Sequence, residues 1–244
     1  MSKSFGGVAA TCDVSMDFPA GSLTAIIGPN GAGKTTLFNL ISGAIRPDSG
    51  RILLDGEDIT GLDSTRIAAR GVGRAFQVAK LFPSLSVEDS LRGALMSPTG
   101  RSANVTRRFP LSETRERADE VMQLLGLQRH ARAISGNLSH GDQKLLDIGL
   151  ALVLQPKVLL LDEPVAGMGP EERYQMIETV HRLWRRGGLT LVFIEHDMDI
   201  VFRIAQQVNV LSYGKLLAQG TPDAIRSDPA VIEAYLGAPN KEPQ

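Results

Sequence analysis

The stretch at residues 28–36, Gly-Pro-Asn-Gly-Ala-Gly-Lys-Thr-Thr, constrains the fold more than any other part of the sequence. It fits the pattern G-x-x-x-x-G-K-[ST], which requires a strand before it and a helix after it. The apolar residues 23–27 predict the strand, and residues 34–41 predict the helix, which Gly43 ends. The sequence therefore predicts a loop that connects a strand to a helix N-terminus.

The residue types in this loop suit a phosphate group. Glycine backbones can turn so that successive N–H groups point at one anion, and the following helix N-terminus favours negative charge there. Lys34 can then reach the β- and γ-phosphates of a nucleotide, Thr35 can ligate Mg²⁺ and Thr36 can donate to the α-phosphate. The alternative is a chance glycine turn that caps a core helix, and hydrolysis stays open. The predicted nucleotide-binding residues of the loop are Gly28, Asn30, Gly31, Gly33, Lys34, Thr35 and Thr36.

Composition weighs against some partners and sites. With 26 Lys and Arg against 27 Asp and Glu, no large electrostatic attraction draws the chain to nucleic acid, and we expect no such partner. Cys12 is the only cysteine, which excludes an internal disulfide and a cysteine-cluster zinc site and is typical of a reducing cytoplasm. No apolar run approaches the ~18 residues of a membrane helix, and residues 1–7 lack the apolar region of a signal peptide. If the protein serves a membrane, we expect partners to span it.

The periodicity of apolar residues changes along the chain and predicts an inserted helical section. Helical patterns occur at residues 86–95 and 112–125, and a third helix runs from Ser139, which can cap it, to about residue 154. The remaining pattern alternates strands and helices, as in an α/β fold. The predicted organisation is an α/β core at residues 1–82 and 150–237, a helical subdomain at residues 83–149 and a flexible tail at residues 238–244.

Polar side chains follow three short segments that we interpret as buried strands. Gln77 follows the first run, Asp162 and Glu163 follow the second, and His196 follows the third. In open α/β sheets, ligands bind at the carboxyl ends of the strands. The alternatives are a solvated loop role for Gln77 and a structural role for His196. The three runs are residues 72–76, 158–161 and 189–194.

The two adjacent carboxylates are the most informative of these residues. Carboxylates at the end of a buried strand are costly unless they meet a cation or a reacting group. In a phosphate-loop protein Asp162 would hold Mg²⁺, and Glu163 would polarise the attacking water. The alternative is that both only cap the following turn.

Shorter patterns predict the remaining elements. Alternating apolar residues at 14–18 predict a strand, and Asp55-Gly56 predicts a tight hairpin turn. Residues 208–218 predict a second hairpin near the C-terminus. Thr221-Pro222 and Asp228-Pro229 each combine a helix cap with proline at the first helical position, which predicts two short helices.

Taken in order, the motifs resemble those of the ATP-binding subunit of an ABC transporter over nearly the whole chain. Residues 28–36 match the Walker A loop, Gln77 matches the Q-loop, and Leu-Ser-His-Gly-Asp at residues 138–142 matches the signature. Residues 158–164, Val-Leu-Leu-Leu-Asp-Glu-Pro, match Walker B, and His196 matches the switch histidine. The resemblance implies an α/β P-loop NTPase (RecA-like) core with an inserted all-helical ABC subdomain and a small antiparallel β region.

The resemblance also implies site roles, with ATP and Mg²⁺ as cofactors. Ser139 and Gly141 would close on the γ-phosphate bound by a second ATPase copy, which is identical or paralogous. Phe5 would stack on the adenine, the alternative being a packed core phenylalanine. The implied catalytic residues are Glu163, His196 and Gln77, and the implied metal ligands are Thr35, Gln77 and Asp162.

Within the family, three segments are similar to uptake ATPases for branched-chain amino acids and related amides such as urea. They are residues 5–7, residues 163–168 and residues 220–237. This similarity implies an ATP-hydrolysing motor subunit, peripheral at the cytoplasmic face of the inner or plasma membrane. Its partners would be transmembrane permease subunits, which Leu81 and Phe82 would contact, and indirectly an extracytoplasmic substrate-binding protein.

Two other functions compete with a transport motor. One is a soluble ABC-type ATPase without permeases, of the cluster-assembly type; the other is a nucleotide-binding regulatory module without turnover, which Glu163 after Asp162 disfavours. The chain also departs from the family pattern. His140 and Asp142 replace a glycine and a glutamine of the usual signature, and Gly169 stands where the D-loop aspartate is expected. The family's first strand is expected to be missing or short.

Overall fold

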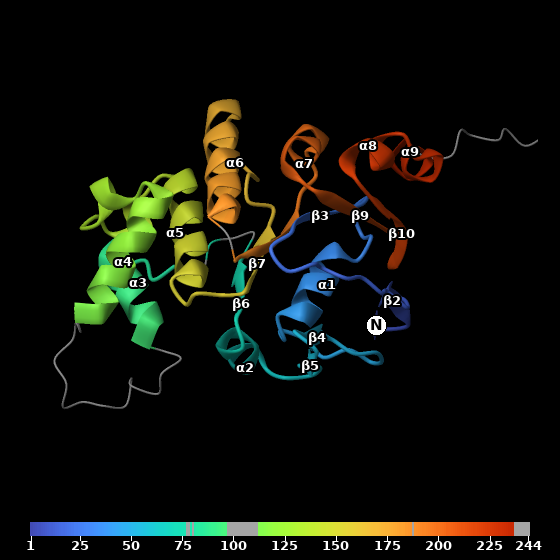
Figure 1. Cartoon of the computed structure of the whole chain (residues 1–244), viewed down its shortest axis with the longest axis horizontal. Helices are drawn as coiled ribbons and strands as arrows, with labels where there is room; N and C mark the ends of the chain where they lie inside the picture. Colours follow the sequence, from blue (N-terminus) through green and yellow to red (C-terminus); the bar gives the residue numbers. More distant parts are fainter. Residues whose placement is uncertain (77–78, 80, 97–111, 187, 237–244) are drawn as a thin grey trace, which may run out of the picture. The chain divides into compact units, whose positions relative to one another are not determined.

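The computed structural model describes residues 1–76, 79, 81–96, 112–186 and 188–236 (Figure 1). The chain forms two compact units. The phosphate-loop unit comprises Met1–Ile67 and Thr190–Gln244, and the carboxylate unit comprises Ala68–Leu189. The predicted Gln77 and the predicted tail, residues 238–244, lie outside the described residues.

Four strands of the phosphate-loop unit form a sheet in the order β10-β9-β3-β8. Strand β3 runs parallel to β8 and β9, with Ile26 opposite Ile194 and Asn209, whereas β10 is antiparallel to β9. Every residue of β3 and β8 is buried, which is typical of parallel strands covered on both faces. The four strands are β3 (Leu23–Ile27), β8 (Thr190–Ile194), β9 (Gln207–Ser212) and β10 (Lys215–Gly220).

Two small antiparallel hairpins and several helices complete this unit. Helix α1 directly follows the phosphate loop, and the division between the units falls within helix α2. The hairpins are β1 (Lys3–Phe5) with β2 (Val8–Thr11) and β4 (Leu53–Leu54) with β5 (Glu57–Asp58). The helices are α1 (Lys34–Ile41), α2 (Ser64–Ala69), α7 (Met198–Ile204), α8 (Pro222–Arg226) and α9 (Pro229–Leu236).

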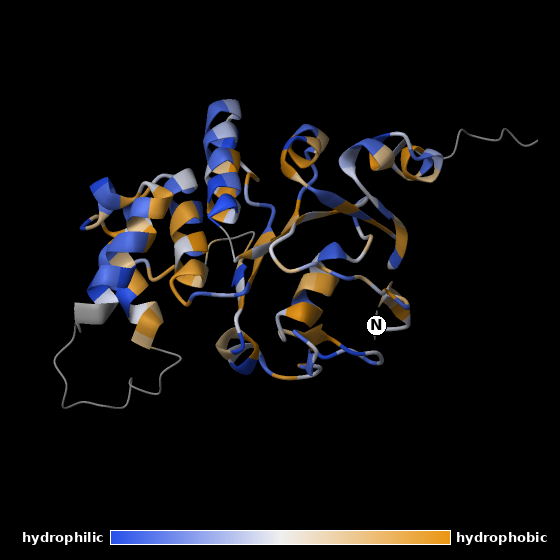
Figure 2. Ribbon diagram, in the orientation of Figure 1, coloured by the Kyte–Doolittle hydropathy of each residue, from blue (hydrophilic) through white to orange (hydrophobic). Residues whose placement is uncertain are grey.

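In its described residues, the carboxylate unit combines two parallel strands with four longer helices. Helices α3, α4 and α5 contact one another (Figure 1), and helices of this unit carry hydrophobic residues next to hydrophilic ones (Figure 2). Gly149 allows this packing, because a Cβ there would lie 3.0 Å from Leu125 and 3.2 Å from Leu91. The elements are β6 (Val72–Ala75), α3 (Val87–Met96), α4 (Ser112–Leu125), η2 (Gln128–His130), η3 (Ser135–Asn137), α5 (His140–Leu152), β7 (Val158–Asp162) and α6 (Pro170–Arg185).

The start of the chain differs from the sequence-based expectation. Residues 14–18 form no strand. The chain does begin with a strand, but β1 has three residues, which agrees with the alternative of a short first strand, and it pairs with β2. Gly6 and Gly7 have positive φ values of 54° and 86°, which permits a tight turn between these two strands. Val14 instead exchanges backbone hydrogen bonds with Met1 and buries its side chain.

The other predicted elements are present, whereas α7, η2 and η3 were not predicted. Helix α7 begins after Asp197, whose Oδ1 accepts from the backbone N–H groups of Asp199 and Ile200.

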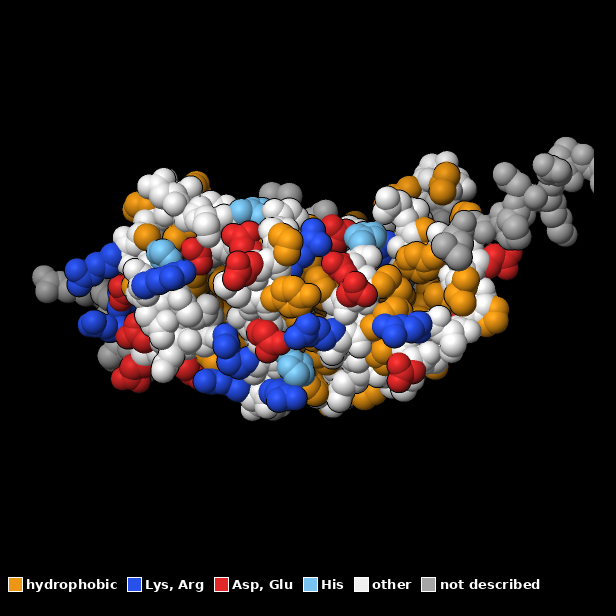
Figure 3. Space-filling model, turned by 90° about the horizontal axis from the view of Figure 1, so that it is seen from above, with side chains coloured by type: hydrophobic (Ala, Val, Ile, Leu, Met, Phe, Trp, Pro, Cys, Tyr) orange, Lys and Arg blue, Asp and Glu red, His pale blue; other side chains and the backbone are white. Residues whose placement is uncertain are grey.

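On the face of the molecule in Figure 3, acidic and basic side chains are interspersed. Within the described ranges, no helix combines the length and the apolar character that crossing a bilayer requires.

Candidate nucleotide site

The phosphate loop is held against neighbouring backbone at two glycines. A Cβ at Gly28 would lie 2.1 Å from the carbonyl oxygen of Leu211, and one at Gly33 would lie 2.2 Å from that of Ala10. Gly31 has open space around it but a φ of 78°, which other residues rarely adopt. Gly28 and Gly33 are therefore required because a side chain would collide with neighbouring backbone. Gly31 is required because of its backbone conformation.

Lys34 lies folded over its own loop. Its side chain is buried, and Nζ donates to the carbonyl oxygens of Gly28 at 2.7 Å and Pro29 at 3.0 Å. A buried ammonium needs such acceptors, because desolvation without them would be costly. The ammonium group of Lys34 is thus held beside the first two residues of the loop.

The N-terminus of α1 is arranged as an anion-binding helix end. Gly33 occupies the cap position, and in this described helix no side chain makes a cap hydrogen bond and no acidic residue lies in the first turn. The first N–H groups of a helix carry partial positive charge and favour an anion. Thr35 in this turn is exposed and Thr36 is half-buried.

Two further residues of this unit lie near the same strand ends. His196 is exposed and follows β8, whose end is beside that of β3 because Ile26 pairs with Ile194. Helix α9 brings Tyr235 to the start of the loop; burial raises the pKa of Tyr235 to about 12, although a hydrogen bond with the Gly28 backbone opposes that rise. Sequence reasoning missed Tyr235, for which the sequence carried no signal.

Phe5 lies at the turn end of the β1–β2 hairpin. It is 49% exposed, so the alternative of a packed core phenylalanine is wrong. The Nζ atom of Lys3 lies 5.6 Å from the ring centroid, and the same atom pairs with Asp48 at 2.6 Å. An exposed aromatic face is available for stacking.

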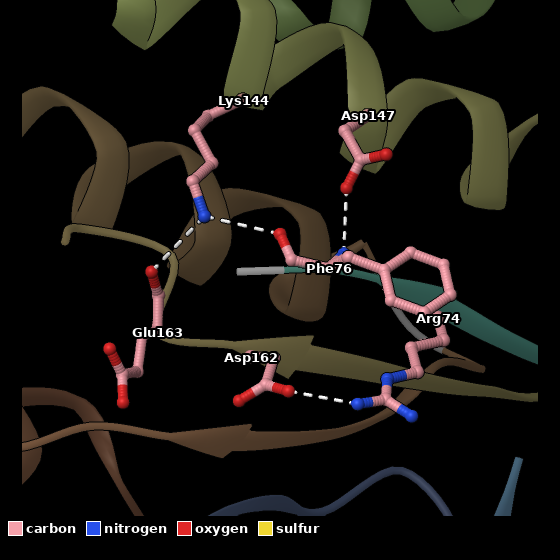
Figure 4. Close-up of polar contacts among 6 residues, drawn as sticks. All are labelled: Arg74, Phe76, Lys144, Asp147, Asp162 and Glu163. Carbon is pink, nitrogen blue, oxygen red and sulfur yellow. Dashed lines mark hydrogen bonds and ion pairs between the residues drawn. The ribbon is translucent and has the colours of Figure 1, made fainter. Parts of the chain in front are cut away.

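In the carboxylate unit, Asp162 ends β7 and forms an ion pair with Arg74 of β6 (Figure 4). Arg74 Nη2 donates to Asp162 Oδ2 at 2.9 Å, and the two side chains are 6% and 4% exposed. A carboxylate this deeply buried requires a cation. The alternative that Asp162 only caps the following turn is therefore wrong.

Glu163 has an unusual backbone conformation. Its φ is 49°, in the left-handed region that a glutamate rarely adopts. Its carbonyl oxygen accepts from the N–H of Ala166 at 3.1 Å and from Lys144 Nζ at 3.4 Å. These bonds hold the turn after β7, and the half-buried carboxylate extends from it.

Two charged residues of α5 clamp the end of β6 (Figure 4). Asp147 Oδ2 accepts from the N–H of Phe76 at 2.7 Å, and Lys144 Nζ donates to the carbonyl oxygen of Phe76 at 3.1 Å. Lys144 and Asp147 are 3% and 4% exposed. The residue before Gln77 is thus held on both sides of its backbone. Sequence reasoning missed this clamp, because isolated charges in a helix pattern usually face solvent.

The signature segment begins α5. Ser139 caps the helix, as predicted: its Oγ accepts from the N–H of Asp142 at 3.1 Å and donates to the carboxylate of that residue at 2.9 Å. Asp142 also lies 3.4 Å from His130 Nε2. Gly141 is half-buried, and a Cβ there would make only an ordinary contact with Glu172, at 3.8 Å.

The departures from the family pattern have local structural roles. His140 Nε2 lies 3.2 Å from the carbonyl oxygen of Ala166, and its ring is 3.3 Å from where a Cβ of Gly167 would be. Gly169, which stands in place of the expected aspartate, is the cap residue before α6, and its N–H donates to Glu172 Oε2 at 3.2 Å. His140 therefore ties the signature to the turn after β7.

The predicted site residues fall into two groups. The phosphate-loop unit holds Phe5, residues 28–36 and His196. The carboxylate unit holds the other group, namely Ser139, Gly141, Asp162 and Glu163. Gln77 is outside the described residues.

The chain matches known proteins along most of its length. Residues 11–166 match the family model described as ABC transporter, and residues 215–239 match that of a branched-chain amino acid ATP-binding cassette transporter. The chain is 38% identical to the high-affinity branched-chain amino acid transport ATP-binding protein LivG of Escherichia coli K12, covering 96% of this chain and 94% of that protein. It is 35% identical to the corresponding protein BraF of Pseudomonas aeruginosa, with the same coverage.

A solved structure agrees with these matches. A nucleotide-free ATP-binding cassette from an ABC transporter is 32% identical and superposes with a TM-score of 0.85, covering 97% of this chain and 96% of that one. The predicted family resemblance, the α/β P-loop fold class and the ATPase class are confirmed. The chain belongs to the ABC transporter family, as an ATP-binding cassette ATPase.

Proposed function

We propose that the chain is the ATP-hydrolysing motor subunit of an importer for branched-chain amino acids or related amides such as urea. The phosphate loop carries the proposal, because it places the buried Lys34 beside an anion-binding helix end. The relatives named for branched-chain amino acid transport support the substrate class, as does the match of residues 215–239. A soluble ABC-type ATPase without permeases is not favoured by these relatives.

The phosphate-loop unit binds the nucleotide in this proposal. Lys34 exchanges its loop carbonyl partners for the β- and γ-phosphates, and Thr36 donates to the α-phosphate. His196 contacts the γ-phosphate, and the exposed face of Phe5 stacks on adenine. Loop N–H groups of Gly28, Asn30, Gly31 and Gly33 surround the phosphates.

Carboxylate and hydroxyl oxygens are the ligands that Mg²⁺ prefers, so Asp162 and Thr35 fit this ion. When bound, Mg²⁺ neutralises the negative charge that develops on the phosphates. Gln77 is the third proposed ligand and senses the γ-phosphate. Glu163 orients the attacking water and accepts its proton, a role that suits a half-buried carboxylate held in an uncommon backbone conformation.

A second ATPase copy completes each site. Ser139 and Gly141 at the start of α5 face the γ-phosphate bound by the phosphate loop of an identical or paralogous chain. The first turn of α5 contains no lysine, and a helix N-terminus of this kind can still bind a phosphate of the nucleotide that another chain holds.

An exposed apolar turn offers a docking surface for a permease subunit. Phe82, Leu85 and Ile134 are 50%, 40% and 41% exposed, and the N–H of Ser135 donates to the carbonyl oxygen of Leu85. Exposed apolar side chains grouped in this way mark interaction sites. A cytoplasmic helix of the permease packs on Leu81 and Phe82, which places the chain peripherally at the cytoplasmic face of the membrane. An extracytoplasmic binding protein delivers the cargo without touching this chain.

The test is to reconstitute this chain in liposomes together with permease subunits and a binding protein whose genes lie next to its own. We expect ATP-dependent uptake of labelled leucine or urea. Leu81→Asp combined with Phe82→Asp should abolish both co-purification with the permease and uptake, while the isolated ATPase stays folded. Ser84→Asp, at an exposed position of the same turn, is the matched control. ATP hydrolysis without any permease association would instead favour the soluble ATPase.

A further inference from the structure

Arg74 and Asp162 form a built-in ion pair at the end of two neighbouring strands. Strands β6 and β7 are parallel, with Arg74 opposite Leu160. The arginine side chain therefore extends along β7 to reach Asp162, two residues further on (Figure 4). The N–O distance of 2.9 Å and side-chain exposures of 6% and 4% make this a buried, close contact.

The guanidinium has a second contact that does not depend on Asp162. Its Cζ atom lies 4.9 Å from the centroid of the Phe76 ring, within the range of a cation–π interaction. Asp147 and Lys144 of α5 hold the Phe76 backbone by hydrogen bonds of 2.7 Å and 3.1 Å. The ring is thus a supported surface on which the guanidinium can remain when its bond to Asp162 is broken.

A divalent cation and the guanidinium cannot both make their best contact with one buried carboxylate. Like charges a few ångströms apart repel strongly in the protein interior. A cation on Asp162 therefore has to displace Arg74 or bind against its charge. Before the cation arrives, the same arginine keeps the carboxylate from being a buried, uncompensated charge.

We propose that Arg74 is a resident counter-ion that neutralises Asp162 when no divalent cation is bound to it and competes with the cation for this carboxylate. The proposal rests on the metal-binding role of Asp162 given under the proposed function. Arg74 thereby weakens metal binding in the resting subunit. On metal binding its guanidinium leaves Asp162 and keeps its contact with the ring of Phe76, the residue that precedes Gln77.

The test is Mn²⁺ binding to the ADP-saturated full chain, measured by EPR, which reports free metal without any turnover. Arg74→Met should tighten Mn²⁺ binding about tenfold, because it removes a positive charge a few ångströms from the metal. Arg74→Lys should stay near the wild-type value, because it keeps the charge. ADP binding without metal should be the same in all three proteins.

Two control variants separate the possible causes. Arg92 pairs with Glu88 at 2.6 Å in the same unit, with side chains 9% and 22% exposed. Arg92→Met should therefore lower thermal stability but leave Mn²⁺ affinity unchanged. Asp162→Asn should weaken Mn²⁺ binding at least tenfold. If Asp162→Asn does not weaken Mn²⁺ binding, the metal role of Asp162 is wrong. If Asp162→Asn weakens Mn²⁺ binding but Arg74→Met does not tighten it, only the counter-ion proposal is overturned.

A measurement on the wild-type chain covers the case in which Arg74→Met does not fold. In a crystal structure with ADP and Mg²⁺ bound, we expect Arg74 to have left hydrogen-bond distance of Asp162 and to lie over the Phe76 ring. An unchanged Arg74–Asp162 bond beside a bound metal ion would overturn the proposal.

Discussion

The phosphate loop and the carboxylate cluster bring functional groups together in different ways. Residues 28–36 are contiguous, and backbone contacts with Leu211 and Ala10 hold the loop. The carboxylate cluster, by contrast, consists of Arg74, Phe76, Lys144, Asp147 and Asp162. These residues come from β6 and the residue after it, from α5 and from the end of β7, and hydrogen bonds of the charged side chains join them (Figure 4). A contiguous motif can be recognised from sequence, whereas a cluster assembled from distant segments cannot.

The difference also predicts what substitutions will do. In the loop, Lys34 bonds to backbone carbonyl oxygens that its own chain segment provides. In the cluster, charged groups depend on each other, so that losing one leaves another buried without its partner. We therefore expect substitutions in the phosphate loop and at Glu163 to change ATP binding or hydrolysis. Substitutions in the carboxylate cluster should first of all lower the free energy of unfolding.

The largest effect expected is that of Glu163→Gln. Loss of the carboxylate that accepts the proton of water should lower ATP turnover by about a thousandfold, while ATP binding persists because Lys34 and Asp162 are unchanged. Phosphate release and equilibrium binding of a fluorescent ATP analogue measure the two effects. Glu171→Gln, at an exposed carboxylate in the first turn of α6, should leave both at the wild-type level. Turnover near wild type in Glu163→Gln would remove Glu163 from the catalytic role.

A mixed dimer tests whether the signature acts on the partner's loop. Pairing a Ser139→Arg chain with a Lys34→Ala chain should leave one intact site, because both defects fall in the same composite site. Placing both substitutions in one chain, opposite a wild-type chain, should leave none. ATP trapped per dimer in a Glu163→Gln background is the readout, with one and zero as the expected values. The reverse result would show that Ser139 serves its own chain's loop.

A stability measurement tests the mutual dependence of the cluster. Asp147 is buried, and Asp147→Ala removes the acceptor of the part-buried Phe76 N–H, so it should lower the free energy of unfolding by about 2 kcal/mol. Asp147→Asn should recover part of the loss, since its amide oxygen can accept the same bond. Urea denaturation measures both. The control is Asp119→Ala, whose side chain is 55% exposed on α4 of the same unit. An Asp147→Ala loss no greater than the control's would contradict the clamp.

The smallest effect concerns Phe5. Phe5→Ala should raise the KM for ATP several-fold, because one aromatic contact of ~1 kcal/mol is lost, with kcat unchanged. Val8→Ala alters the exposed partner of Phe5 in the hairpin and controls for changes in the hairpin itself. Equal KM values in the two variants would leave Phe5 without a role in adenine binding.

Local patterns predicted most elements, but they failed where the outcome depended on distant contacts. Residues 14–18 alternate in polarity like a strand, yet Val14 pairs only with Met1 while residues 3–11 form the hairpin. Helix α7 was overlooked although Asp197 is a helix cap with apolar residues behind it. Polarity alternation over five residues is weak evidence, because it does not say which partner strand is available.

The sequence alone determined the phosphate loop, the strand-end positions of Asp162, Glu163 and His196, and the cap at Ser139. Each of these depends on residues adjacent in the chain, whose backbone preferences and spacing are local properties. Only the tertiary structure decided that Arg74 neutralises Asp162 and that Lys144 and Asp147 hold Phe76. Those contacts join residues between 68 and 88 positions apart, and burial selects such charge pairs only once the segments have packed together.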